Sequence, residues 1–126
     1  MAKILVVEDE VELNKIICRS LRDRGYDVTS AVNGLEALSL TENSKFDMIL
    51  TDIMMPKMDG FELADSIRLT DKEIPIVFMT AKDDKASKML GYSIGVDDYI
   101  VKPFDMDILI MKKGRLLFAV MRLQKK

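Results

Sequence analysis

The chain has 126 residues, of which 48% are hydrophobic and 32% charged, with a formal net charge of −2. This composition is typical of one folded domain and gives no general attraction for nucleic acid. The chain has no histidine, which excludes imidazole catalysis, and the single cysteine, Cys18, excludes an internal disulfide and suits a reducing compartment. Without a run near the ~18 apolar residues of a membrane span or a signal-peptide layout, we expect a cytoplasmic protein with no membrane partner.

Apolar runs and amphipathic segments alternate along the chain. Strands are predicted at residues 3–7, 26–31, 47–52, 74–79 and 99–101, with the fourth ending before Thr80. Helices are predicted between the strands, and a final helix from about residue 105. Alternating units of this kind indicate an α/β fold with a parallel sheet and helices on both faces. No linker or repeat interrupts the pattern, so we expect a single domain over residues 1–126.

The spacing of apolar residues assigns the faces of two of the predicted helices. In the first helix, Leu13, Ile17 and Leu21 recur at four-residue spacing and Ile16 lies beside them. In the helix before the fifth strand, the apolar positions are Ala86, Met89, Leu90 and Ile94. We expect these residues to form the apolar face of each helix.

Four of the predicted strands run into a side chain that can handle a phosphate or a metal. The first is followed by Glu8 and Asp9, the third ends at Asp52, the fourth runs into Thr80, and the fifth runs into Lys102. The carboxyl ends of parallel strands line one edge of a sheet, and ligands bind in the crevice outside this edge. The sequence therefore predicts that three carboxylates, a hydroxyl and an ammonium group converge there.

Phosphoryl transfer to Asp52 is the chemistry that this set favours. A carboxylate is already ionised at neutral pH and can attack phosphorus without a base, giving an acyl phosphate. A divalent cation offsets the repulsion between the two anions, and Mg²⁺ prefers carboxylates, waters and phosphate oxygens. We predict Asp9 as a direct Mg²⁺ ligand beside Asp52, Glu8 as a ligand acting partly through water, and the backbone carbonyl of Met54 as a further ligand.

Lys102 and Thr80 are predicted to contact the phosphoryl oxygens, the lysine after first pairing with the nucleophilic carboxylate. Each candidate residue also has a purely structural interpretation. Asp9 or Glu10 would suit a helix N-cap, and a lysine before proline is often a surface residue in extended geometry. The joint placement of these residues at strand ends favours the functional interpretation.

The chain resembles the receiver domain of two-component response regulators from Lys3 to about Leu109. The segments that carry the resemblance are residues 4–10, 50–60, 79–81 and 95–104, and together they are highly specific. Glu-Asp rather than Asp-Asp after the first strand, together with Asp97-Asp98-Tyr99, is similar to the winged-helix class of transcriptional regulators.

The resemblance implies a flavodoxin-like, doubly wound sheet of five parallel strands in the order 2-1-3-4-5. It implies that Asp52 accepts a phosphoryl group from the phosphohistidine of a histidine kinase, and that the Lys102–Pro103 peptide bond is cis. Tyr99 would swing inward when Thr80 moves toward the phosphate, and this would alter an output surface made of the fourth helix, fifth strand and fifth helix. The domain would be a switch and not a turnover enzyme, catalysing only its own phosphorylation and dephosphorylation.

The predicted carboxyl-terminal helix departs from the family pattern. Lys113 stands where an apolar residue is expected, and Gly114 weakens a helix by roughly 1 kcal/mol relative to alanine. Residues 116–121 are all apolar, which is more than one core-facing stripe requires. We expect either a crowded interior face or a homodimer formed through an altered, extended or exchanged helix. DNA would be contacted only through a domain absent from this sequence.

Three other functions remain as alternatives. A haloacid-dehalogenase-like phosphohydrolase also uses an aspartyl nucleophile with Mg²⁺, but it usually needs a second aspartate where this chain has Met54. A flavodoxin-type cofactor binder would need a phosphate-cradling loop after the first strand, where Glu8-Asp9-Glu10 would repel a phosphate. A receiver-like interaction module that works without phosphorylation would fit the unusual carboxyl-terminal helix.

Overall fold

Five strands and four helices alternate in the computed structural model, which describes residues 2–80 and 85–102. In chain order they are β1 (Lys3–Val7), α1 (Val11–Asp23), β2 (Asp27–Ala31), α2 (Gly34–Asn43), β3 (Met48–Asp52), α3 (Gly60–Arg68), β4 (Ile76–Thr80), α4 (Lys85–Ile94) and β5 (Asp98–Val101). The predicted peptide bond at Pro103 and the predicted helix from about residue 105 lie outside the described residues.

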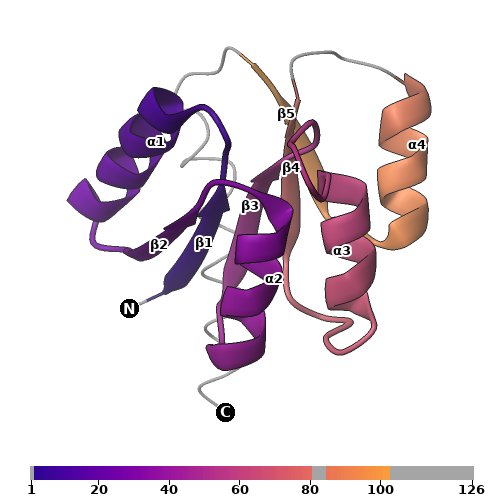
Figure 1. Cartoon of the computed structure of the whole chain (residues 1–126), viewed down its shortest axis with the longest axis horizontal. Coiled ribbons are helices and arrows are strands. Elements are labelled where there is room, and N and C mark those ends of the chain that lie inside the picture. Colours follow the sequence, from indigo (N-terminus) through magenta and orange to yellow (C-terminus); the bar gives the residue numbers. More distant parts are fainter. Residues whose placement is uncertain (1, 81–84, 103–126) are drawn as a thin grey trace.

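The five strands form one parallel sheet in the order β2-β1-β3-β4-β5 (Figure 1). This is the predicted flavodoxin-like order, and it is confirmed. The order reverses direction after β1, since β2 lies on one side of β1 and β3 on the other. The carboxyl ends of β1 and β3 therefore lie side by side at the switch point, which is where open α/β sheets bind ligands.

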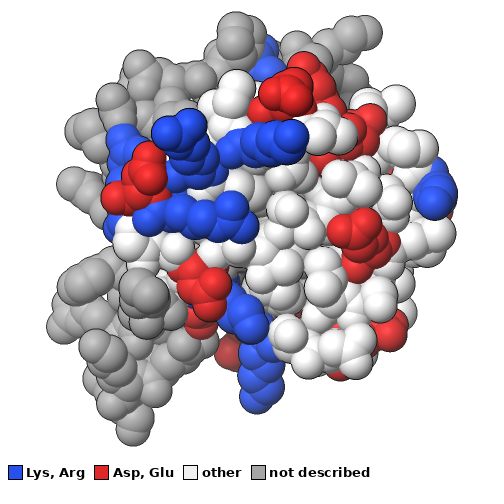
Figure 2. Space-filling view, turned by 60° about the vertical axis from the view of Figure 1, so that its left-hand side comes forward, with Lys and Arg blue, Asp and Glu red and all other residues white. Residues whose placement is uncertain are grey.

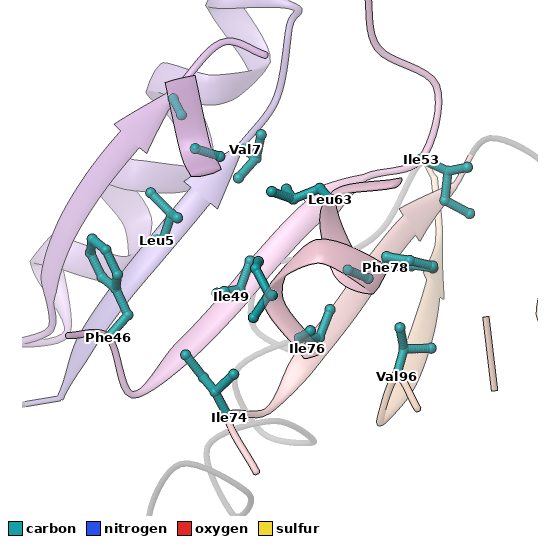
Figure 3. Packing of buried hydrophobic residues seen from close by; sticks show 14 of the residues in the cluster. Leu5, Val7, Phe46, Ile49, Ile53, Leu63, Ile74, Ile76, Phe78 and Val96 are labelled. Carbon is teal, nitrogen blue, oxygen red and sulfur yellow. The ribbon is translucent and has the colours of Figure 1, made fainter. Parts of the chain in front are cut away.

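Strand side chains alternate between two hydrophobic cores, one on each face of the sheet. Figure 3 shows the larger core, in which Leu5, Ile49 and Phe78 from three strands pack with residues of α3. The strand neighbours of these residues point the opposite way, into a core completed by α1. Its strand members are Ile4, Val6, Val28, Met48, Leu50, Val77 and Met79. Burial on both faces explains why the strands are almost continuously apolar.

The structure corrects three sequence-based predictions. Strand β4 includes Thr80, because the β4–β5 ladder continues to the pair Thr80 and Val101. Ile16 is 57% exposed, since the buried face of α1 is centred on other residues, namely Asn14, Ile17, Cys18 and Leu21. Met89 and Leu90 are also exposed, because the side of α4 that packs inward carries a glycine, Gly91.

The turn after β3 brings the start of α3 against the end of that strand. Asp59 caps α3 through a capping box with Glu62, and the Gly60 N–H donates to the Ile53 carbonyl at 2.7 Å. A Cβ at Gly60 would lie 2.5 Å from the Asp52 carbonyl oxygen and 2.9 Å from the Ile53 Cα. Since both contacts are with backbone, a side chain at this position would displace the end of β3.

The Gly60→Ala substitution is therefore expected to lower the free energy of unfolding by about 3 kcal/mol, as overpacking against backbone does. Gly25→Ala is the matched control, because Gly25 has a φ of +92° but open space around it, and it should cost only about 1 kcal/mol. Urea unfolding of both variants measures the difference. Equal losses would contradict the close approach at Gly60.

Candidate functional site

The ends of β1, β3 and β5 direct three ionisable side chains toward the same place. Continuing the alternation along each strand, Glu8 follows Val6, Asp52 follows Leu50, and Lys102 follows Ile100, all on the face that packs with α1. Lys102 reaches across β4 because lysine has a long side chain, and its backbone N–H donates to the Thr80 carbonyl at 2.7 Å.

The Lys102 ammonium group lies between two buried carboxylates. It donates one hydrogen bond to Glu8 Oε1 and a second to Asp52 Oδ2 at 3.1 Å. Glu8 is fully buried and Asp52 is 8% exposed. Burial alone would lower the pKa of Lys102, but hydrogen bonds and charge attraction from Glu8 and Asp52 outweigh this effect, and the pKa of Lys102 is raised. The lysine therefore stays protonated between the two anions.

Backbone N–H groups hold the second oxygen of each of these carboxylates. The Ile53 N–H donates to Asp52 Oδ1 at 2.8 Å, and the Glu10 N–H donates to Glu8 Oε2 at 3.1 Å. The orientation of both side chains is thus set by the turns that follow their own strands. One oxygen of Asp52 faces the lysine and the other faces the start of the β3–α3 loop.

A group of carboxylates at this edge has the composition of a hard-cation site. Glu8, Asp9 and Asp52 each offer an oxygen, and these atoms lie within 4.8 Å of one another. Oxygen ligands with two or more negative charges suit Mg²⁺. Loss of solvent, a hydrogen bond with Glu8 and repulsion from its charge raise the pKa of Asp9, and a cation would relieve that repulsion. The Met54 side chain is 77% exposed, so its predicted contribution rests on the backbone carbonyl.

Thr80 and Tyr99 lie on the other face of the sheet from Lys102. Thr80 is 9% exposed at the end of β4. Phe78, two residues earlier on the same strand, pairs with Tyr99 on β5, and their rings meet edge to face with centroids 5.4 Å apart. The Tyr99 ring is buried, and it also contacts Tyr92 of α4. The structure therefore describes the inward position of this side chain.

The sequence-based prediction missed the contact between Glu8 and Lys102. It paired the lysine with Asp52 alone. The spacing of residues in the sequence locates the ends of strands, but it does not show that the Glu8 side chain is buried beside the lysine. The alternation of side chains along each strand could have predicted this contact, since it places Glu8, Asp52 and Lys102 on one face of the sheet. Of the predicted site residues, the structure brings Glu8, Asp9, Asp52 and Lys102 together at the carboxyl edge of the sheet. Thr80 and Tyr99 lie on the opposite face.

Comparisons with known proteins agree with this geometry. A family model described as the response regulator receiver domain matches residues 4–112. The chain is 40% identical over 117 residues to the probable transcriptional regulator ycf29 of Porphyra purpurea, covering 91% of this chain and 56% of that protein. Chemotaxis protein CheY4 of Vibrio cholerae superposes with a TM-score of 0.88 and 34% identity, covering 91% of this chain and 98% of that one.

A second solved structure, response regulator TrrA of Thermotoga maritima in complex with Mg(2+)-BeF, has a TM-score of 0.83 and 34% identity, covering 92% of this chain and 99% of that one. The chain spans about half the length of the curated relatives it matches. Within the described ranges, no helix has the length and apolar character needed to cross a bilayer. The match over most of the chain and the sheet order together show that the chain belongs to the response regulator receiver domain family.

Proposed function

We propose that this chain is a phosphorylation-controlled signalling switch in which Asp52 accepts a phosphoryl group from the phosphohistidine of a sensor histidine kinase. The observation that carries the proposal is the meeting of Glu8, Asp9, Asp52 and Lys102 at one edge of the sheet. Membership of the receiver family supports the same reaction. The domain acts as a phosphoryl acceptor and not as a turnover enzyme.

In the proposed reaction an Asp52 carboxylate oxygen forms a bond to phosphorus while the bond from phosphorus to the donor nitrogen breaks. The electron pair of that bond leaves with the imidazole, and Asp52 has no proton to lose, so no general base is needed. Lys102 is already beside Asp52 Oδ2 and can follow the charge onto the phosphoryl oxygens, where Thr80 donates a hydrogen bond. Glu8, Asp9, Asp52 and the Met54 carbonyl would hold Mg²⁺, which neutralises phosphoryl charge when bound.

The α1 side of the molecule offers a surface for the protein phosphodonor. Val11 and Ile16 are exposed apolar residues on this helix, and Lys15 and Arg19 are exposed beside them. Figure 2 shows Lys and Arg side chains on this side, with Asp and Glu side chains among them. Lys15 pairs with the exposed Glu12. An apolar centre with a rim of both charges would suit a kinase surface with an apolar centre and charged borders. This exchange would take place in the cytoplasm.

The proposed output runs through Thr80 and Tyr99. Movement of Thr80 toward a phosphoryl group would stabilise the inward Tyr99 ring seen here, because both side chains lie on the same face of neighbouring strands. Moving a two-state equilibrium from 1:99 to 99:1 takes about 5.5 kcal/mol of differential binding. The lysine and threonine contacts to the phosphoryl group, made in only one state, would supply part of this energy.

We further propose that output involves a homodimer and transcription. The α4 surface carries exposed Met89, Leu90 and Tyr92, which a second copy of the chain would cover. Control of transcription would require a DNA-binding domain outside this sequence. A module that works without phosphorylation remains the competing function.

Magnesium-dependent phosphorylation by a small acyl phosphate tests the proposed acceptor. Intact-mass measurement is expected to show one added phosphoryl group on the wild type and on Asp27→Asn, and none on Asp52→Asn. Asp27 is the control because it is an exposed aspartate at the start of β2. Excess chelator should also abolish the adduct. An adduct on none of the three proteins would favour the module that works without phosphorylation.

Alkaline unfolding tests the inward packing of Tyr99. Burial raises the pKa of Tyr99 to about 12, with a further contribution from Tyr92 and an opposing one from the Gly91 backbone. The unfolded chain releases this proton near pH 10, so the stability that Tyr99 contributes is present below pH 10 and is lost as the pH rises toward 12.

The Tyr99→Phe variant should therefore lose less unfolding free energy than the wild type between neutral pH and about pH 11. Urea unfolding at the two pH values measures this difference. Tyr26→Phe, at a partly buried tyrosine packed against the other core, shows whether removing any tyrosine hydroxyl has the same effect. Parallel losses in the wild type and Tyr99→Phe would show that the ring does not occupy the buried position.

A further inference from the structure

A buried hydrogen-bond network connects α1 to the end of β1, directly behind the acidic edge. Asn14 is 5% exposed, and its Nδ2 amide donates to the carbonyl oxygens of Glu8 and Ala31, both at 3.0 Å. Its Oδ1 accepts a hydrogen bond from the Cys18 thiol at 3.2 Å. The side chain thus uses both of its N–H donors and its acceptor inside the fold.

Chemistry determines which way this amide faces. The two backbone carbonyls can only accept hydrogen bonds, so the nitrogen must point toward them. Burial raises the pKa of the Cys18 thiol, and the protonated thiol supplies the donor that Oδ1 needs. The reversed amide would place an oxygen against two carbonyl oxygens, which a buried site does not tolerate.

The amide extends the β1–β2 ladder by one step beyond the strands. The Glu8 N–H already donates to the Ala31 carbonyl at 3.0 Å, and the chain after Ala31 turns away toward α2. The Asn14 side chain donates to the Glu8 carbonyl, which is the next acceptor along β1 beyond the paired residues. The Glu8 carbonyl belongs to the peptide group that joins Glu8 to Asp9. Because this group is planar, a hydrogen bond that holds its oxygen also restricts the position of the Asp9 backbone.

Asn14 also contacts the backbone that follows Asp9. Its backbone N–H donates to the Glu10 carbonyl at 2.9 Å in the first turn of α1. One residue therefore contacts the backbone immediately before and immediately after Asp9. We propose that Asn14 is a positioning residue for the metal-binding carboxylates Glu8 and Asp9, an inference that rests on the proposed function.

The Asn14→Leu variant tests this role, because leucine has a similar size and no hydrogen-bonding atoms. Isothermal titration of the whole chain with Mg²⁺ alone is expected to give a dissociation constant raised about tenfold, as for other residues that orient metal ligands. The rate of phosphorylation by a small acyl phosphate should recover at saturating Mg²⁺, because Asp52, Thr80 and Lys102 are unchanged. A role limited to core stability would leave the Mg²⁺ dissociation constant unchanged.

Ile17→Ala is the matched control, because Ile17 is a fully buried residue on the same helix and in the same core. It should lower stability while leaving the Mg²⁺ dissociation constant unchanged. An unchanged constant in Asn14→Leu, or an equal change in both variants, would overturn the positioning role. Absence of Mg²⁺ binding by the wild type would overturn the proposed metal site itself, and the inference with it.

A second measurement needs no variant and so does not depend on Asn14→Leu folding. Scalar couplings across hydrogen bonds in isotope-labelled wild type should link the Asn14 side-chain nitrogen to the carbonyl carbons of Glu8 and Ala31. Observation of both couplings with and without Mg²⁺ supports the network. Their absence in both conditions would overturn the proposal.

Discussion

The contact of the Lys102 ammonium with Glu8 and Asp52 is the interaction on which the acidic edge depends. Two carboxylates that are almost completely removed from water repel each other and lose hydration, and removing a cation from such a group costs far more than an exposed ion pair contributes. Lys102 compensates for this cost through its hydrogen bonds to both. The buried charges of the acidic edge are thus balanced by a side chain of the chain itself.

Several features of the backbone position these charged side chains close together. The parallel order puts the ends of β1 and β3 side by side, and the absence of a side chain at Gly60 lets α3 begin directly against Asp52. Behind β1, the Asn14 amide completes the hydrogen bonding of the turn that carries Glu8. Strong local constraints therefore surround the acidic edge. Tyr99, on the other face, packs against a helix that carries exposed apolar residues.

The fold could be predicted from the sequence because alternating apolar strands and short amphipathic helices allow few topologies. The location of the site followed from the same reasoning, since strand ends share one edge. The exposure of Ile16 could not be predicted, because a buried asparagine and a buried cysteine shift the inner face of α1. The exposure of Met89 and Leu90 was missed for a similar reason, as a glycine takes the inner position against Tyr99. Which residues of a helix face inward depends on contacts with residues that are distant in the sequence.

The central claim is that charge balance between Lys102 and its two carboxylates holds the site together. The most direct measurement is the urea unfolding free energy of Lys102→Met and of Lys102→Met combined with Glu8→Gln. The account predicts a loss of about 3 kcal/mol in the single variant and recovery of most of it in the double variant, in which one buried charge is removed. Equal stability of Lys102→Met and the wild type would contradict it.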